Sequence, residues 1–481
     1  MPAFRTHRSP LKSALYILVS FVLPNLLFGQ DNLGIAGSTR APANTVLINP
    51  SSIADSRAFL DFNLVGASVF ARNNFVFIPG DQFSIRSLSD VKEVSYNRAN
   101  APFGAYADVA AHGPSLTFNV RKHAIGLYSG VRVVADVRGI PESLGYYITE
   151  GFQYREQMGK KYTVTDLRAH GLAWMEFGGS YATIISRNGD QLTLAGITAK
   201  RLVGIGGVGL RVDEWNYAVL DSNNMKTYSL RGEYGFNDPA LGSGKGFGFD
   251  LGITFKKTGR NVASYVPFSP CTDGGYLYKI GFSLLDIGSI KFTGPFYRNV
   301  FNETEQAEWN DFSGTTAEDA SDLDSLFNAG FNLSQDNADE ESFRMKLPTA
   351  FSAQFDYHLG KNFYLLGIAT LGLPRKNHLG VQRASYIGIV PRFEIKRFEV
   401  SVPVSMYEFR NPQVGLMLRL NSIVIGSDMI GPWIFNQDAY GADIYCSIKY
   451  TIFRSWNCRE RKESSERNKR GSGKHIPCPT W

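Results

Sequence analysis

The chain has 481 residues, a net charge of +6, and 43% hydrophobic and 13% aromatic residues. This near-balanced charge gives no reason to expect nucleic-acid binding. No run of about 18 apolar residues follows the N-terminus, which argues against helical membrane spans there. Four cysteines, none in a CxxC pair, are too few for a disulfide framework and do not support a metal site: Cys271, Cys446, Cys458 and Cys478. The last two either form a bridge or stay free thiols.

Residues 1–30 have the layout of a secretory signal peptide. A basic stretch precedes an apolar run over residues 14–28, and residues 29 and 30 form a suitable cleavage site. We therefore expect an exported protein whose mature chain begins near Asp31. Residues 31–57 are polar and rich in turn-forming residues. They are expected to form a segment on the periplasmic side or inside a barrel lumen.

Strand-like alternation recurs through residues 58–453. Large apolar residues alternate with Gly, Asp, Thr and Lys over residues 247–256, and residues 441–453 show the same pattern, with Ile448 beside Lys449. Such two-faced strands suit lipid on one side and water on the other, and an open sheet edge cannot be satisfied in hydrocarbon. We predict an all-β, antiparallel transmembrane β-barrel of the cell outer membrane whose last strand pairs with its first. An edge strand of a soluble sandwich is the alternative interpretation of residues 441–453.

Turn signals divide these stripes into strands. Asn188-Gly189 predicts a two-residue hairpin in which both residues take positive φ. Further turns are expected on the periplasmic side, at residues 286–288, 359–361 and 395–397 and at Asn421. Long external loops are expected at residues 70–113, 138–168 and 301–342. The pattern predicts about sixteen strands, with an error of roughly two or more.

Two of the long loops and the C-terminal tail have distinct compositions. Residues 138–168 have partly helical character, which fits a loop helix, a lid or a plug in the lumen. Residues 301–342 are acidic, and they form either a divalent-cation-binding or receptor-like loop or a solvated surface loop. Residues 454–481 are basic and aperiodic, which predicts a disordered periplasmic tail. Contact of this tail with anionic headgroups or peptidoglycan is the alternative.

Several stretches resemble a known family. They are NPSSIAD (49–55), DFNLVGAS (61–68), HGPS (112–115), YKIGFSLLDIGSIKF (278–292) and RMKLPTAFSAQFDYHLG (344–360). Together they resemble a family of Bacteroidota outer-membrane β-barrels described only as a domain of unknown function, over roughly residues 32–453. That family is similar in layout to barrels of long-chain fatty-acid transporters and of type IX secretion components. The resemblance implies about fourteen strands, and it brings no catalytic residues with it.

The sequence offers no catalytic, cofactor or metal site. The seven histidines form no HExxH motif and share no metal-ligand spacing; His358 beside Asp356 is expected to be a solvated lumen residue rather than a catalytic group or a ligand. GIGGVG (204–209) is not a dinucleotide fingerprint, because no helix pattern follows it, and its glycines are expected to mark bulges. No GxSxG elbow or Walker loop occurs. We therefore expect a protein that is not an enzyme.

The expected function is that of a barrel that passes or binds small or amphiphilic molecules through its lumen. The alternative is a surface scaffold or a secretion-associated barrel that binds an exported protein partner. Outer-membrane lipid and the barrel assembly machinery are further expected partners. Specificity would lie in the long external loops.

Overall fold

The computed structural model describes residues 32–56, 58–80, 95–97, 102–120, 122–145, 158–221, 224–258, 275–293, 296–303, 307–309, 342–374 and 378–452. The expected signal peptide, most of the acidic segment 301–342, and the basic tail 454–481 lie outside these residues. Cys271, Cys458 and Cys478 also lie outside them, so the bridge between the last two stays a prediction. Cys446 is a free, exposed cysteine.

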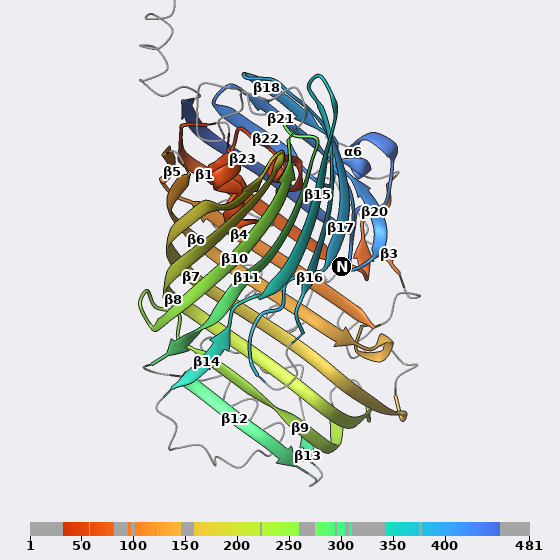
Figure 1. Ribbon diagram of the computed structural model, residues 1–481. Coiled ribbons are helices and arrows are strands. Elements are labelled where there is room, and N and C mark those ends of the chain that lie inside the picture. Colours follow the sequence, from red (N-terminus) through yellow and green to blue (C-terminus); the bar gives the residue numbers. More distant parts are fainter. Residues whose placement is uncertain are drawn as a thin grey trace, which may run out of the picture.

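The described strands form one antiparallel sheet that closes into a barrel of fourteen wall strands. Closure is direct: β1 (Leu60–Asn73) pairs with β23 (Gly441–Ile452) on one edge. On its other edge β1 pairs with β4 (Phe103–His112) and β5 (Ser115–Val120). The prediction that the last strand pairs with the first is therefore confirmed (Figure 1).

Several wall strands are interrupted along their length, so that one position in the wall is filled by two or three segments. After β1 and the β4–β5 strand, three uninterrupted wall strands follow in chain order: β6 (His123–Ile140), β7 (Lys161–Asn188) and β8 (Gln191–Val219). The next three wall strands are each made of several segments: β9 (Met225–Asn237) and β10 (Gly244–Lys257); β11 (Tyr278–Phe292), β12 (Phe296–Glu303) and β13 (Ala307–Trp309); and β14 (Phe343–Lys346) and β15 (Ala350–Gly360). The wall then continues with β16 (Phe363–Gly372) and β17 (Tyr386–Glu394), with the strand made of β18 (Phe398–Ser401) and β19 (Val404–Tyr407), with the strand made of β20 (Arg410–Val414) and β21 (Leu416–Leu420), and with β22 (Ile423–Ser427) and β23.

The predicted turn at residues 286–288 is wrong, and it contributed to the high strand count. These residues lie inside β11, where the pairing with β10 shifts register and Asp286 takes a φ of 52°. A residue with positive φ inside a strand marks a β-bulge, which resembles a turn in sequence but leaves the strand running in the same direction. The count of about fourteen strands that the resemblance implied is confirmed, and the count of about sixteen from the turn pattern is two too high.

The predicted division into an apolar outer face and a polar inner face is confirmed. In β10, Phe249 and Leu251 are 44% and 45% exposed, whereas Asp250 between them is 1% exposed. In β23, Ile448 is 49% exposed and Lys449 is 2% exposed. The apolar stripes are thus open on the outside of the barrel, and the charged stripes are enclosed within it.

Short turns gather at one end of the barrel, here called the terminal end because β1 begins and β23 ends there. The turns between β15 and β16, β17 and β18, and β21 and β22 lie at this end, as predicted. The β7–β8 hairpin lies there too, but only Gly189 of its residues has positive φ, at 59°, so the predicted φ of Asn188 is wrong. We call the opposite end the distal end.

Two of the predicted external loops are partly strand. Residues 70–113 contain the end of β1, all of β4 and a small hairpin of β2 (Val76–Phe77) and β3 (Ser95–Tyr96). Residues 138–168 contain the end of β6 and the beginning of β7. β7 and β8 are 28 and 29 residues long, and with β9, β12 and β13 they extend past the rest of the distal rim (Figure 1).

Helical structure is sparse, and no described helix has the length and apolar content needed to cross a membrane. α6 (Gly431–Phe435) follows the short strand β22 and exposes Ile434 and Phe435. The other named helices are α2 (Leu33–Ala36), α3 (Pro42–Thr45) and the 3₁₀ helix η1 (Pro50–Asp55), which precede β1. Their position defines the candidate site.

Candidate functional site: a plugged, charged lumen

Residues 32–56, here called the plug, lie inside the barrel. Its helices are short, and Pro42 and Pro50 each stand at the start of one, where the missing N–H of proline costs nothing. Asn49 caps η1 by accepting a hydrogen bond from the backbone N–H of Ser51 at 3.0 Å. A segment of such short turns fits a round lumen better than one long helix would.

The first half of the plug is held by wall carboxylates. Asp428 accepts hydrogen bonds from the backbone N–H groups of Leu33, at 2.8 Å, and Gly34, at 3.3 Å. Further along, the hydroxyl of Ser38 donates to Glu399 at 2.8 Å. Thr39 and Arg40 both contact Glu394, with the Arg40 guanidinium 3.3 Å from the carboxylate. All of these wall groups are buried.

The second half is held by a different part of the wall, on β10, β11 and β15. Asn49 donates to Gln354 at 2.9 Å, and the hydroxyls of Ser51 and Thr254 lie 2.7 Å apart. Asp55 ends η1 between Lys256 and Lys279. Burial raises the pKa of the Asp55 carboxyl, but the two lysines lower it by more, so the pKa lies below its ordinary value of 3.8.

Wall glycines make room for η1. A Cβ added to Gly252 would lie 2.1 Å from the Asn49 side chain, and one added to Gly196 would lie 2.5 Å from the backbone of Pro50. Glycine within a strand often marks a close backbone approach. The alternation of large residues with glycine in β10 therefore has two causes: an apolar face outside and a closely fitted plug inside.

Asp286 joins several wall strands through one carboxylate. It lies 2.9 Å from Arg132, 2.6 Å from Lys200 and 3.4 Å from Arg383, and all four side chains are buried. Asp250 completes the group, because it accepts the backbone N–H of Asp286 at 2.7 Å and pairs with Lys200 at 2.8 Å. The bulge in β11 thus places a carboxylate among three cations.

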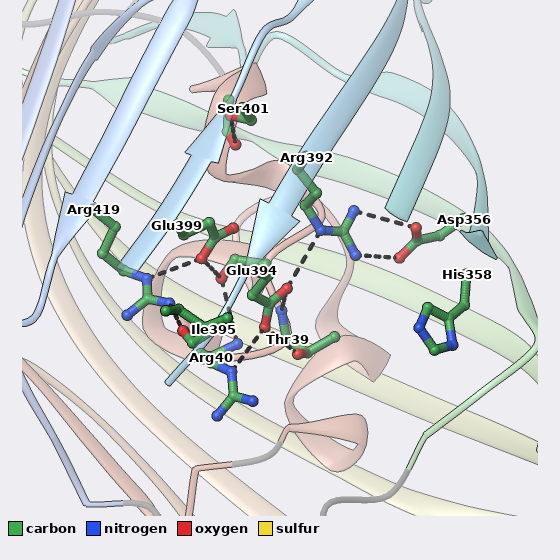
Figure 2. Close-up of polar contacts among 12 residues, drawn as sticks. Thr39, Arg40, Asp356, His358, Arg392, Glu394, Ile395, Glu399, Ser401 and Arg419 are labelled. Carbon is green, nitrogen blue, oxygen red and sulfur yellow. Dashed lines mark hydrogen bonds and ion pairs between the residues drawn. The ribbon is translucent and has the colours of Figure 1, made fainter. Parts of the chain in front are cut away.

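A second charged group surrounds the middle of the plug (Figure 2). Arg392 pairs with Asp356 at 2.8 Å and contacts Glu394 at 3.4 Å, while Arg419 pairs with Glu399 at 2.9 Å. Because charges out of water need partners, this pairing is what a closed lumen requires. Within the described ranges no cluster of His, Cys, Asp and Glu has the arrangement of a metal site.

His358 lies at the terminal edge of this group, where the sequence placed it, beside Asp356. Its ring nitrogens lie 3.1 Å from the carbonyl oxygen of Tyr276 and 3.0 Å from that of Lys361, and its ring stacks on Tyr364. These contacts hold the turn between β15 and β16. The named partners of the ring include neither a nucleophile nor a second metal ligand.

Two small cavities of roughly 50 and 70 Å³ lie between the plug and the wall. The first is lined by Asn32 and Asn44 of the plug and by Lys200, Asp286 and Arg383. The second lies at the other side of the plug, next to Lys279, Gln354 and Asp356. Each volume suits a few water molecules at most. At these two places the plug leaves room for little more than water between itself and the wall.

The sequence placed Asp250, Lys256, Asp356 and Arg419 on inward faces but could not pair them. Asp286 was missed as a central group, because residues 286–288 were interpreted as a turn. The glycines of GIGGVG (204–209) also have a structural role. A Cβ at Gly207 would lie 2.6 Å from Met345, and a Cβ at Gly209 would lie 3.0 Å from Leu379. These glycines receive lumen side chains.

An apolar outside, a closed ring of antiparallel strands and a plugged charged lumen define the class of this protein: a plugged β-barrel of the outer-membrane type. The chain belongs to the family of unknown function DUF5723, whose model matches residues 50–428. No curated protein matches the chain.

Several solved structures are similar over most of the chain. A FadL homologue of Pseudomonas aeruginosa has a TM-score of 0.41 at 10% identity, covering 89% of this chain and 98% of its own. The toluene transporter TbuX of Ralstonia pickettii has a TM-score of 0.40 at 10% identity, with coverage of 89% and 98%. The toluene transporter TodX of Pseudomonas putida has a TM-score of 0.32 at 7% identity, with coverage of 89% and 100%.

Proposed function

We propose that this protein resides in the outer membrane and passes small or amphiphilic molecules through its lumen when the plug moves. The observation that carries the proposal is the way the lumen is filled. The plug is joined to the wall covalently where it leads into β1. The wall holds it through hydrogen bonds and ion pairs and through apolar packing of Ile35, Val46 and Ile53.

The polar contacts favour a plug that can move, because water replaces a hydrogen bond at a small net cost, about 0.5–1.5 kcal/mol. The apolar packing of the plug against the wall therefore sets most of the cost of its movement. The wall carboxylates that hold the plug also have partners in the wall: Glu394 keeps Arg392, and Glu399 keeps Arg419. The barrel could therefore release the plug and retain a balanced, wettable interior.

The position of the apolar stripes supports the membrane location. Exposed Phe, Leu and Ile side chains recur on the outer faces of β6, β8, β10, β15, β17, β22 and β23. In a transmembrane barrel this band faces hydrocarbon. The proposal assigns transport without catalytic chemistry, and it leaves the exported-partner scaffold as the outcome to expect if no solute passes.

The test uses a reversible lock on the plug. Ser51→Cys/Thr254→Cys, in a background with the four native cysteines replaced by serine, places two thiols where hydroxyls lie 2.7 Å apart. We expect proteoliposomes to swell in L-arabinose when the pair is reduced and to stop swelling when it is oxidised. Equal swelling in both states would show that passage does not require the plug to move. No swelling in either state, or in the parent, would contradict transport.

The matched control carries single substitutions, Ser51→Cys or Thr254→Cys. Each changes one hydroxyl and cannot form the bridge, so oxidant should leave its swelling rate unchanged. A heat-induced shift in gel mobility, which reports a folded barrel, is measured for every variant before its swelling is compared.

A further inference from the structure

A second segment enters the lumen, from the distal end. Residues 379–385, here called the strap, lie between β16 and β17, and its members Leu379, Val381, Arg383 and Ala384 are all buried. Leu379, Val381 and Ala384 belong to the apolar cluster that fills the lumen, together with Trp174, Phe292, Phe343 and Met345. The strap is therefore packed inside the barrel rather than over its rim.

The strap and the plug meet across the smaller cavity. Asn32 and Asn44 of the plug line one part of this space, and Arg383 of the strap lines another. Arg383 reaches Asp286 at 3.4 Å, the carboxylate that also binds Arg132 and Lys200. The two segments thus stand one after the other along the lumen, and a molecule that passed the plug would next meet the strap.

Besides this apolar packing, the strap is held by a few polar contacts and by little backbone pairing with the sheet. The backbone N–H of Gln382 donates to Asp136 at 2.9 Å, and Arg138 donates to the carbonyl oxygen of Arg383 at 3.3 Å. Its backbone pairing with the sheet in the described chain is an isolated bridge between Gly380 and Lys346. At its end, the backbone N–H of Ser385 donates to Glu408 at 2.7 Å.

The wall beneath the strap is shaped to receive an apolar side chain. Cβ atoms added to Gly209 and Gly235 would both lie close to Leu379, at 3.0 and 3.1 Å. Buried His170 stands beside this surface with its Nδ1 3.6 Å from Asp136. Neither of its ring nitrogens has a hydrogen-bond partner among the described residues. Buried polar groups without partners are rare, and water entering on the strap's departure would supply them.

We infer that the strap is a second gate, in series with the plug, and that its departure uncovers a binding site for the apolar part of the passing molecule at Gly209 and Gly235. The inference rests on the proposed transport function and names the site at which an amphiphile would bind. Leu379 occupies that site in the closed state. Asp136, Arg138 and Asp286 hold the strap over it.

The geometry allows a direct lock. A Cβ at Gly209 would lie 3.2 Å from the Cβ of Leu379, slightly inside the disulfide range of about 3.5–4.5 Å, so a small shift suffices to form the bond. Gly209→Cys/Leu379→Cys is made in the cysteine-free background with Ser51 and Thr254 intact, which leaves the plug free. We expect swelling in L-arabinose when the pair is reduced and loss of swelling when it is oxidised.

The single variants Gly209→Cys and Leu379→Cys serve as controls. Oxidant should not change their swelling, and Leu379→Cys should swell faster than the parent because it loses the packed leucine. Arg383→Gln gives an independent measurement, since it weakens the contact with Asp286 without cysteine chemistry and should also raise the rate.

The outcomes separate the two claims. If the oxidised pair swells as fast as the reduced pair, the strap is not a gate, while transport by the parent still stands. If the parent and all variants are silent, the proposed transport fails and the inference fails with it. Faster uptake of the apolar dye N-phenyl-1-naphthylamine by Arg383→Gln would support the binding site. Faster arabinose entry with unchanged dye uptake would overturn that part of the inference.

Discussion

At the scale of single residues, the lumen depends on carboxylates that each serve several partners. Asp286 shows the physical cost of this arrangement most clearly. Its backbone takes a φ of 52°, a region that L-residues seldom adopt, and its side chain faces Arg132, Lys200 and Arg383. The local strain is offset because the bulge supplies the negative charge that three buried cations need.

Asp286→Asn should destabilise the barrel severely. The amide keeps the size of the side chain but removes its charge, and breaking a buried ion pair by removing one partner costs about 3–5 kcal/mol. Urea unfolding in lipid vesicles, followed by tryptophan fluorescence, measures the free energy of unfolding. Asp190→Asn is the matched control: the Asp190 side chain is 42% exposed and 3.9 Å from Lys257, and its loss should change stability by less than about 0.5 kcal/mol. Equal losses would argue against the charged lumen.

Asp55 predicts how the plug responds to pH. Because its folded-state pKa lies below 3.8, its pairing with Lys256 and Lys279 is fully present above that value and is lost as pH falls through the folded pKa. Hydrogen-exchange protection of residues 50–56 should therefore be the same at about pH 7 and pH 5 and should fall only in stronger acid. Asp55→Asn should lose protection at all of these pH values. A fall between the first two would show that Asp55 is not held this way.

At the scale of elements, the strands could be predicted from alternation but their interruptions could not. β10 and β23 each have one face on the outside of the barrel and the other in the lumen, so apolar and polar residues alternate along their sequences. The bulge at Asp286 and the breaks between β9 and β10 depend on which partner strand lies alongside. The identity of the partner strand depends on residues far apart in the chain, so the local sequence pattern does not reveal it.

A single charged substitution tests whether the outer face of β23 contacts lipid. Ile448→Arg places a guanidinium on the exposed face and should cost about 2–4 kcal/mol if the residue lies near the bilayer midplane. Ile448→Leu keeps the face apolar and should cost less than about 1.5 kcal/mol. Both are measured by urea unfolding in the same vesicles. A tolerated arginine would place this face in water.

The close fit of the plug against β10 gives an element-scale prediction. A Cβ at Gly252 would overlap the Asn49 side chain at 2.1 Å, so Gly252→Ala should push η1 away from the wall and loosen the plug. Trypsin should then cut after Arg40 in folded barrels. Gly367→Ala is the control, because a Cβ there meets its nearest neighbour at 3.8 Å. Cleavage of both variants at the same rate would contradict the fit.

At the scale of the whole molecule, the barrel was predictable and its contents were not. Alternation, the lack of long apolar runs after the N-terminus and the closing strand together indicated a transmembrane barrel. The sequence left open whether residues 31–57 lie outside or inside, because a polar, turn-rich segment suits water and a charged lumen equally well. The strap went unpredicted because Leu379 and Val381 look like ordinary loop residues until the glycines opposite them are known.

Crosslinking tests most directly whether the plug lies inside the lumen, on which the proposed function depends. Ser51 and Thr254 are 203 residues apart in sequence, and their side chains meet only if η1 lies against the inner face of β10. Ser51→Cys/Thr254→Cys should form a disulfide in nearly all molecules when native outer membranes are treated with mild oxidant, as read by mass spectrometry of the joined peptides. Recovery of the two thiols unjoined and freely alkylated, in barrels that are otherwise folded, would contradict the account.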